Sequence, residues 1–509
     1  MAFSASITAW MSRGLLRNTA ALYVRGLVAL ACGIFASRWV FASLGTEGYG
    51  IYVLLCGVMA IVVFVNDVAG RATERYLAVA VGRGEDVRAW FGTAVVIHGV
   101  LMLAILALGY PLTVLAVEKW LSVPSEWVGD AVKMLMWLFI SSAVGVANTP
   151  CRNAMAAYGR IGEVALWGCI YPCINLAAAA WMVMHAGRWP VFYVMALACG
   201  TIVTEVLVFV RANSLFPECR ISRLARPDSM RVMSVLRFAI WRLGADLGAL
   251  VGKQGLTILV NKLLGPAWNA SLGVARTVSN HADSLAVSLG NTLVPQLANE
   301  AGAGNAGKLA RSAECYSFIM ASVFLFFAVP IAVSMEDIFI IWLNQVPPGA
   351  VACAWWLMGA LAFGEGTRSF FDAVTATGKV PRLYVACGVL QAGMLVAAGL
   401  AWCLGFGFNG MTAGVFLMQV ALSGVIVALA ERRIGTSWRR WLLRAVVPLA
   451  ASVGVAVLAG GLVRMSLPEV GIVWRTLLAS GTAVLVFAGG CWCAGRTCLQ
   501  RGGEACGSL

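Results

Sequence analysis

Charged residues are scarce in this chain of 509 residues. Asp, Glu, Lys and Arg together make up 12% of it, whereas 61% of the residues are hydrophobic. A soluble globular domain carries about 25% charged residues, so this composition excludes one and indicates an integral membrane protein. No loop expected on the outer side exceeds roughly 15 residues, which is too short to build a folded domain.

The cysteine and histidine residues indicate neither a disulfide framework nor a metal site. None of the 15 cysteines lies in an expected outer loop, so no disulfide framework is predicted. The cysteine spacings fit no zinc pattern, and we predict no metal site. The three histidines, His98, His185 and His281, are scattered, and we interpret them as packing or boundary residues. The N-terminal stretch shows no cleavage site, so the first apolar run is expected to remain as an uncleaved helix.

Apolar runs long enough to span a bilayer recur along the whole length of the chain. They predict an all-α polytopic membrane protein with about fourteen transmembrane helices. The approximate segments are 18–43, 48–65, 90–117, 131–149, 164–186, 190–210, 238–261, 268–294, 313–334, 350–373, 382–404, 409–430, 442–463 and 473–494.

The basic residues are unevenly distributed between the two sides of these helices. The net charge is +14, but most of the 37 basic residues fall in segments on the side of the N-terminus. The opposite loops hold only Lys119, Arg188, Lys262, Arg464 and Arg475. This asymmetry predicts a multi-pass protein of the inner (cytoplasmic) membrane with both termini in the cytoplasm. It favours anionic membrane lipids as partners of the basic segments, and it argues against nucleic acid.

An internal repeat predicts the organisation of the domains. A shift of 220 positions places Leu16-Arg17 on Leu236-Arg237 and Leu44-Gly45 on Leu264-Gly265. Each half then holds six helices, which makes the halves parallel repeats with a binding site expected between them. The predicted domains are an N-terminal lobe (1–210), a basic cytoplasmic connector (211–237), a C-terminal lobe (238–431), and a basic interfacial stretch with helices 13 and 14 (432–509).

One predicted helix, 237–264, carries charges where a membrane span should have none. At about 100° per residue, Arg242, Asp246 and Lys253 fall on one stripe. A second stripe of small residues, Gly244, Gly248 and Gly252, is typical of close helix packing. Charge inside a membrane indicates a functional site by default, and the alternative is a structural ion pair between Arg242 and Asp246.

The first helix adds a resemblance to a known family. Asn18-Thr19, Arg25, Arg38, the stretch 44–50 (LGTEGYG) and Tyr158-Gly159-Arg160 resemble the polysaccharide (O-antigen, Wzx-type) flippases. These belong to the multidrug/oligosaccharidyl-lipid/polysaccharide (MOP) exporter superfamily, with lipid II flippases and MATE antiporters. The resemblance implies two parallel six-helix lobes plus two C-terminal helices, and a transporter rather than an enzyme.

The same resemblance implies a substrate and a process. Alternating access would move an undecaprenyl-pyrophosphate-linked oligosaccharide from the inner to the outer leaflet, for lipopolysaccharide or other cell-surface polysaccharide, alongside other polysaccharide assembly proteins. A MATE-like cation or multidrug antiporter is the alternative, but such proteins typically bind cations at a carboxylate in helix 1, where this chain has Arg25 and Arg38. A membrane glycosyltransferase or O-antigen ligase/polymerase needs a catalytic loop that is missing here.

Four basic residues are candidate ligands for the pyrophosphate, because guanidinium and ammonium groups bind phosphate oxygens. They are Arg25, Arg242, Lys253 and Arg276, and we expect Arg25, Arg242 and Lys253 to line one cationic cavity between the lobes. The alternative for Arg25 is snorkelling to the head groups.

Four acidic residues of the second half are candidates for coupling to H⁺ or Na⁺, and no other cofactor is predicted. They are Asp246, Asp283, Glu365 and Asp372. The alternative is internal pairing of Arg276 with Asp283 and of Arg368 with Asp372. Glu205 and Lys133 have no oppositely charged neighbour on their own helices and receive no role.

Overall fold

The computed structural model describes residues 2–185, 187, 189–220, 228–302, 306–377 and 381–500. Only the backbone is described at 2–16, 19, 241–245, 285, 288–296, 298–299, 302, 381–382 and 495–500. The described chain is helical throughout and contains no β-strand, as the sequence predicts. Two compact units form: Met1–Asp246 with Asn261–Asn269, and Leu247–Val260 with Ala270–Leu509.

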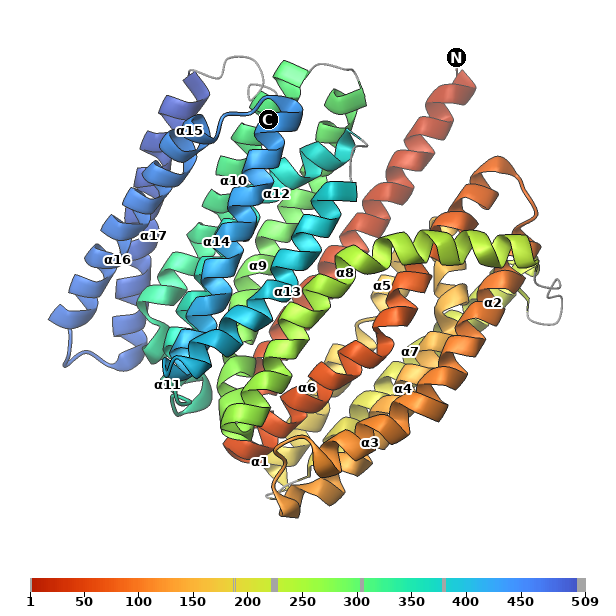
Figure 1. The fold of residues 1–509 in the computed structure, drawn as a ribbon, viewed down its shortest axis with the longest axis horizontal. Helices are drawn as coiled ribbons and strands as arrows, with labels where there is room; N and C mark the ends of the chain where they lie inside the picture. Colours follow the sequence, from red (N-terminus) through yellow and green to blue (C-terminus); the bar gives the residue numbers. More distant parts are fainter. Residues whose placement is uncertain are drawn as a thin grey trace. The chain divides into compact units, whose positions relative to one another are not determined.

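The helices follow one another with short connections (Figure 1). In chain order they are α1 (Ala2–Arg83), α2 (Val87–Ala104), α3 (Tyr110–Lys119), α4 (Ser125–Ala157), α5 (Ile161–Trp167), α6 (Ile170–Met184), α7 (Pro190–Leu215), α8 (Ser229–Leu264), α9 (Pro266–Gly302), α10 (Ala306–Val333), α11 (Met335–Leu343), α12 (Ala350–Ala376), α13 (Pro381–Cys403), α14 (Gly407–Ile434), α15 (Trp438–Trp441), α16 (Val447–Ser466) and α17 (Ile472–Gln500). Short π-helical turns, Ile105–Gly109 and Leu442–Val446, lead into α3 and α16, and a 3₁₀ turn, Pro217–Cys219, follows α7.

Ten helical stretches in the described part of the chain are long and apolar enough to cross a membrane. The first of them, Ala20–Arg83, has 64 residues. At 1.5 Å per residue it would be about 96 Å long, far more than a bilayer core of about 30 Å. It is broken at Gly45, so it supplies two of the predicted segments. The charged helices α8, α9 and α12 are not among the ten, and the count of fourteen spans stays a prediction.

The glycine at the break has a counterpart in the second half of the chain. Gly45 has φ 69° and ψ −178°. Gly265, which separates α8 from α9, has φ 88° and ψ −178°. A positive φ with extended ψ is readily accessible only to glycine. The two positions are 220 apart, so the backbone repeats the conformation as well as the Leu-Gly pair that the sequence repeat aligns.

Each unit has an apolar core of its own. In the first unit, Leu77, Phe91 and Val208 belong to a buried cluster that joins α1, α2, α4 and α7. In the second, Tyr316, Phe370 and neighbouring residues pack α10, α12 and α14 together, and these helices lie side by side in Figure 1. One cysteine departs from the prediction, because Cys315 of α10 is disulfide-bonded. The prediction considered only outer loops, and Cys315 lies within a helix.

The glycine stripe predicted on α8 packs directly against a neighbouring backbone. A Cβ atom placed on Gly248 would overlap the backbone of Gly388, and one on Gly252 would overlap the carbonyl of Gln391. Both partners belong to α13, so the backbones of α8 and α13 are in close contact at two glycines that lie about one turn apart. The predicted packing face is therefore confirmed at these two glycines. Gly244 is among the residues for which only the backbone is described.

We expect Gly252→Ala to destabilise the second unit, because the added methyl group meets rigid backbone rather than a mobile side chain. Overpacking of this kind costs about 1–3 kcal/mol or more. Thermal unfolding of purified protein in detergent measures the effect. Gly399→Ala, on α13 with no atom near the new Cβ, is the matched control and should unfold like the wild type. Equal stability of both variants would contradict the close approach of the backbones.

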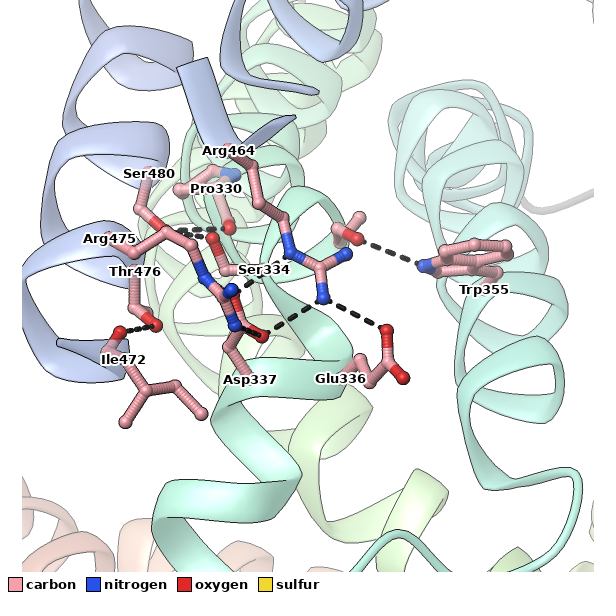
Figure 2. A network of polar contacts seen from close by, with 11 residues as sticks. Pro330, Ser334, Glu336, Asp337, Trp355, Arg464, Ile472, Arg475, Thr476 and Ser480 are labelled. Atoms are coloured by element: carbon pink, nitrogen blue, oxygen red, sulfur yellow. Dashed lines mark hydrogen bonds and ion pairs between the residues drawn. The ribbon is translucent and has the colours of Figure 1, made fainter. Parts of the chain in front are cut away.

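One carboxylate joins the two C-terminal helices of the second unit to α11 (Figure 2). Asp337 of α11 has a side chain that is 1% exposed. Arg464 at the end of α16 binds both of its oxygens, at 2.9 Å and 2.9 Å. Arg475 at the start of α17 does the same, at 3.2 Å and 2.7 Å. The α16–α17 hairpin lies outside the predicted repeat, and these bonds connect both of its helices to α11.

Asp337 has the pKa of a strongly paired carboxyl group. Burial by itself would raise the pKa, but hydrogen bonds from Arg464 and Arg475 outweigh burial and hold the pKa of Asp337 below its usual value of 3.8. A carboxyl group whose pKa is lower in the folded than in the unfolded protein stabilises the fold above its unfolded pKa. That contribution is lost as the pH falls through the folded pKa.

Asp337→Asn should therefore destabilise the protein at neutral pH, by about 3 kcal/mol, since it leaves two partly buried arginines without their counter-charge. The variant should also lose the part of the acid sensitivity, below about pH 4, that this carboxyl group causes. Unfolding curves at neutral and acidic pH measure both effects. Glu336→Gln is the control: its side chain is 55% exposed and pairs with Arg464 alone, so about 0–1 kcal/mol is expected. Similar losses in the two variants would rule out the special role of Asp337.

Candidate functional site

A cavity of about 350 Å³ lies within the first unit. Arg25 of α1, Arg152 of α4 and Glu205 of α7 are the charged side chains among the described residues that line it. Polar residues of α6 and α7, Asn175 and Thr204 among them, complete the wall. Two arginines and one glutamate leave this cavity with an excess of one positive charge.

Glu205 is the buried counter-charge of the first cavity. It is 5% exposed, and both carboxylate oxygens accept hydrogen bonds. Arg152 Nη1 donates to Oε1 at 2.7 Å, and Asn148 Nδ2 donates to Oε2 at 2.7 Å. A second guanidinium nitrogen of Arg152 donates to the Gly145 carbonyl at 3.0 Å. Arg152 is therefore held in place and largely neutralised by Glu205.

Arg25 has no such partner: no carboxylate in the described part of the chain lies within ion-pair distance of it. Its side chain is exposed and lies against Gly168, where a Cβ atom would sit 2.9 Å from Arg25 Nε. The missing side chain at Gly168 leaves room for the guanidinium beside the junction of α5 and α6. The excess positive charge of the first cavity is thus carried by Arg25.

The second unit contains a separate cavity of about 310 Å³, lined by α8, α9, α12, α13 and α14. Lys253, Arg276 and Glu365 are its charged residues among those described. Amide side chains of Gln391 and Gln419 add hydrogen-bonding groups. This cavity also has an excess of one positive charge, and it brings together three of the residues that the sequence singled out.

Arg276 joins α9 to α8 rather than pairing within its own helix. It donates to Thr257 Oγ1 at 2.6 Å and to the Lys253 carbonyl at 2.6 Å. Neither acceptor carries a net charge, so the positive charge of Arg276 remains available. The alternative pairing of Arg276 with Asp283 is wrong, because the guanidinium binds α8 and forms no ion pair among the described residues. The two residues are seven positions apart, and the nearer neighbours on α8 take the guanidinium.

The carboxylates of the second unit are less well satisfied than Glu205. Glu365 is 8% exposed; its Oε1 accepts from Arg368 at 3.4 Å, and its Oε2 is buried without a partner. Arg368 pairs with Glu365, one turn earlier on α12, and makes a further contact as well, so its pairing with Asp372 stays a prediction. A buried, incompletely bonded carboxylate is a group that can take up a cation or a proton.

Asp246 lies at the boundary of the two units and belongs to the first. It pairs with Arg71 of α1 at 3.5 Å, a partner that the helical pattern of 237–264 did not indicate. Asp246 makes further contacts as well. The side chain of Arg242 lies outside the described residues, so its pairing with Asp246 and its place in a cavity stay predictions.

Sequence reasoning missed the Arg152–Glu205 pair. In the sequence, Arg152 is one of the many basic residues on the side of the N-terminus, and Glu205 has no opposite charge on its own helix. The two are 53 positions apart and meet only because α4 packs on α7. An isolated acidic residue within an apolar run was the available signal, since such a residue requires a partner from another helix.

Comparison with known proteins identifies the fold. No protein-family model matches the sequence, and no curated protein matches it. A structure of the lipid II flippase MurJ in an inward closed conformation has a TM-score of 0.68 over 92% of this chain and 97% of that chain, with 12% identity. A structure of an inward-facing MATE family multidrug resistance transporter of the MOP superfamily has a TM-score of 0.62 over 81% of this chain and 94% of that chain, with 14% identity. A structure of the MATE multidrug transporter DinF-BH has a TM-score of 0.60 over 82% of this chain and 95% of that chain, with 14% identity.

At these identities the similarity shows the fold alone. This chain is a multi-pass helical membrane protein whose fold is similar to the folds of these three structures. The proteins with which it shares that fold are flippases and transporters rather than enzymes.

Proposed function

We propose that this protein is a flippase that moves an undecaprenyl-pyrophosphate-linked oligosaccharide from the inner to the outer leaflet of the bacterial inner membrane. In this proposal both termini are cytoplasmic, and the product is used for O-antigen or another cell-surface polysaccharide. The other proteins of polysaccharide assembly are its partners. Movement occurs by alternating access, with H⁺ or Na⁺ as the coupling ion.

The excess of positive charge in the two polar cavities carries the proposal. Arg25 in the first unit, and Lys253 with Arg276 in the second, have no carboxylate within ion-pair distance among the described residues. Keeping an unpaired cation within a helical membrane protein costs several kcal/mol, so an anionic substrate group is the natural compensation. A pyrophosphate offers at least two charges and many acceptor oxygens, which suits guanidinium groups.

A MATE-like cation or multidrug antiporter is the second candidate, because MATE structures share the fold. A transporter of organic cations requires negative charge in its binding cavity. Both cavities described above have the opposite sign. The charge of the cavities therefore favours the anionic substrate over the cationic one.

The coupling ion is assigned to the acidic residues of the second unit. Glu365 lines the second cavity, and one of its oxygens is buried without a partner. Asp283 also has an oxygen in that state. Asp372, on the same helix as Glu365, completes the set in the second unit, and Asp246 of the first unit is the fourth proposed residue. Binding of a cation near Lys253 and Arg276 would change the charge of this cavity in step with the transport cycle.

Arg25→Ala should reduce flipping of a defined lipid-linked oligosaccharide in proteoliposomes by roughly 10- to 150-fold, since a charged hydrogen bond contributes about 1.5–3 kcal/mol. Arg25→Lys should restore part of the rate, because it keeps the charge and loses the bidentate geometry. Arg38→Ala, in the same helix but not part of the cavity wall, is the control and should flip normally. Membrane abundance is measured alongside. Normal flipping by Arg25→Ala at normal abundance would remove this residue from the proposed site.

Glu365→Gln should abolish the dependence of transport on the coupling ion, because the amide keeps the shape and loses the titratable charge. Transport is measured in proteoliposomes under imposed proton and sodium gradients. Asp372→Asn serves to locate the site within α12. Unchanged gradient dependence in both variants would show that these carboxylates do not bind the coupling ion.

A further inference from the structure

A chain of buried polar side chains runs through the first unit, and the proposed flippase cycle does not yet use it. At its centre is His98 of α2, which is 0% exposed. Its Nδ1 lies 2.7 Å from Asn66 Oδ1, and its Nε2 lies 3.2 Å from Thr73 Oγ1. Both partners belong to α1 and are themselves buried. His98 is thus part of a bonded network, and the interpretation of it as a packing residue is incomplete.

The state of Nδ1 follows from the hydrogen bonds around Asn66. The amide nitrogen of Asn66 donates to Thr149 Oγ1 at 3.4 Å. Thr149 uses its own hydrogen for the Gly145 carbonyl, at 3.1 Å. The amide oxygen of Asn66 therefore faces His98, and an amide oxygen only accepts. The network assigns a hydrogen to Nδ1 of His98 in every charge state.

The state of Nε2 depends on one hydroxyl group. Thr73 Oγ1 accepts a bond from Asn153 Nδ2 at 2.7 Å. Its single hydrogen has two acceptors in reach, the Gly70 carbonyl at 3.0 Å and His98 Nε2. If the hydrogen points to Nε2, the imidazole is neutral. If it points to Gly70, Nε2 must carry a hydrogen of its own to bond Thr73, and the ring is a cation.

Neither state leaves a buried group without a partner. The Gly70 carbonyl also accepts from Asn153 Nδ2, at 2.9 Å, so it stays bonded when Thr73 turns away from it. Most buried sites satisfy one protonation state of a histidine and penalise the other. This one is built to satisfy both, at the cost of rotating one hydroxyl group.

We propose that His98 is a proton-binding site, and that its charge controls the binding of anions in the cavity of the first unit. The proton adds to Nε2, and the Thr73 hydroxyl turns its own hydrogen from Nε2 to the Gly70 carbonyl. No other bond is made or broken. The link to the cavity runs through Asn66 and Thr149 to Arg152, which donates to Thr149 Oγ1 at 3.2 Å.

Five acidic and four basic side chains lie on the helices and the turn packed around this network, and two ion pairs join four of them. The charged side chains on the helices and turn packed around this network are Asp67, Arg71, Glu74 and Arg75 of α1, Arg152 of α4, Glu205 of α7, Glu218 of the 3₁₀ turn, and Arg231 and Asp246 of α8. Arg152 is connected to His98 by hydrogen bonds through Thr149 and Asn66. It is paired with Glu205, and Arg71 is paired with Asp246.

A proton on His98 adds to the positive potential that Arg25 and Arg152 create in the cavity. An anion there and a proton on His98 stabilise one another, and by linkage the effect is reciprocal. The identity of the anion, a lipid pyrophosphate, rests on the proposed function. Proton binding itself does not, which allows the two to fail separately.

Histidine ¹⁵N NMR of the full-length protein in nanodiscs tests the proton site directly, because the chain has only three histidines. His98→Gln identifies the resonances of His98 by their loss. Between about pH 8 and about pH 3 we expect His98 to change from a single hydrogen, on Nδ1, to a hydrogen on both nitrogens. A ring that keeps one charge state over this range, or a neutral ring with its hydrogen on Nε2, overturns the proposal.

Asn66→Asp supplies a directional check. A carboxylate beside Nδ1 favours the cation, so His98 should titrate about one to three pH units higher in this variant. If Asn66→Asp leaves the titration of His98 unchanged, the contact with Asn66 does not control the ring. The measurement on the wild type stands whether or not this variant folds.

The coupling to the cavity is tested with inorganic pyrophosphate as the probe. Saturating pyrophosphate should move the titration of His98 to higher pH in the wild type and not in Arg25→Ala. Absence of a shift in the wild type, or the same shift in both proteins, overturns the coupling. A protein that shows the titration and the shift but flips no lipid-linked oligosaccharide would instead sink the proposed function and leave the proton site intact.

Discussion

The high free-energy cost of a charged group inside an apolar helix bundle organises the polar interior of this protein. Three buried carboxylates show how the cost is met. Glu205 is bonded on both oxygens by α4, Asp337 is held by two arginines of the C-terminal hairpin, and Glu365 has a partner on one oxygen only. An unpaired ion of this kind costs several kcal/mol, so the position of each acidic side chain influences which helices meet. The number of hydrogen-bond partners on each carboxylate then distinguishes structural groups from groups that can bind a proton or a cation.

Asp337 represents the structural extreme. All of its hydrogen-bonding capacity faces arginines, and the contact joins α11 to two helices that lie outside the repeat. Glu365 and Asp283 lie toward the other extreme, since each keeps a buried oxygen without a partner. His98 is intermediate, because its neighbours satisfy the neutral ring and the cation alike. Groups of the last two kinds are the ones whose protonation or ion occupancy can change.

Cations exceed carboxylates in both polar cavities. Glu205 neutralises Arg152 in the first cavity, and Glu365 is drawn to Arg368 in the second. Arg25, Lys253 and Arg276 are left as the charges available to a ligand. The fold by itself does not specify the charge of a substrate, so the proposed function rests on the sign of the charge in the cavities. Here the residual charge is positive in each cavity, and the proposal of an anionic substrate depends on that charge.

Much of the fold was accessible from the sequence, because helical membrane proteins encode it locally. Apolar runs predicted the helices, and the Leu-Gly pair repeated at a spacing of 220 marked two glycines with the same backbone conformation. The glycine stripe of 237–264 predicted a face for close packing, and α13 occupies it at Gly248 and Gly252. These features depend on residues within one helix or on a repeated pair of identical residues.

The partners of the charged residues were decided by the tertiary structure alone. Helical spacing suggested Arg276 with Asp283 and Arg368 with Asp372; in the structure Arg276 binds α8, and Arg368 pairs with Glu365. Arg152 meets Glu205, and Arg71 meets Asp246, across gaps of 53 and more positions. A side chain of this length reaches several helices, and the acceptor it finds depends on how those helices pack. The sequence determined which residues are ionisable and which helices carry them; only the packing determined which charges cancel and which remain.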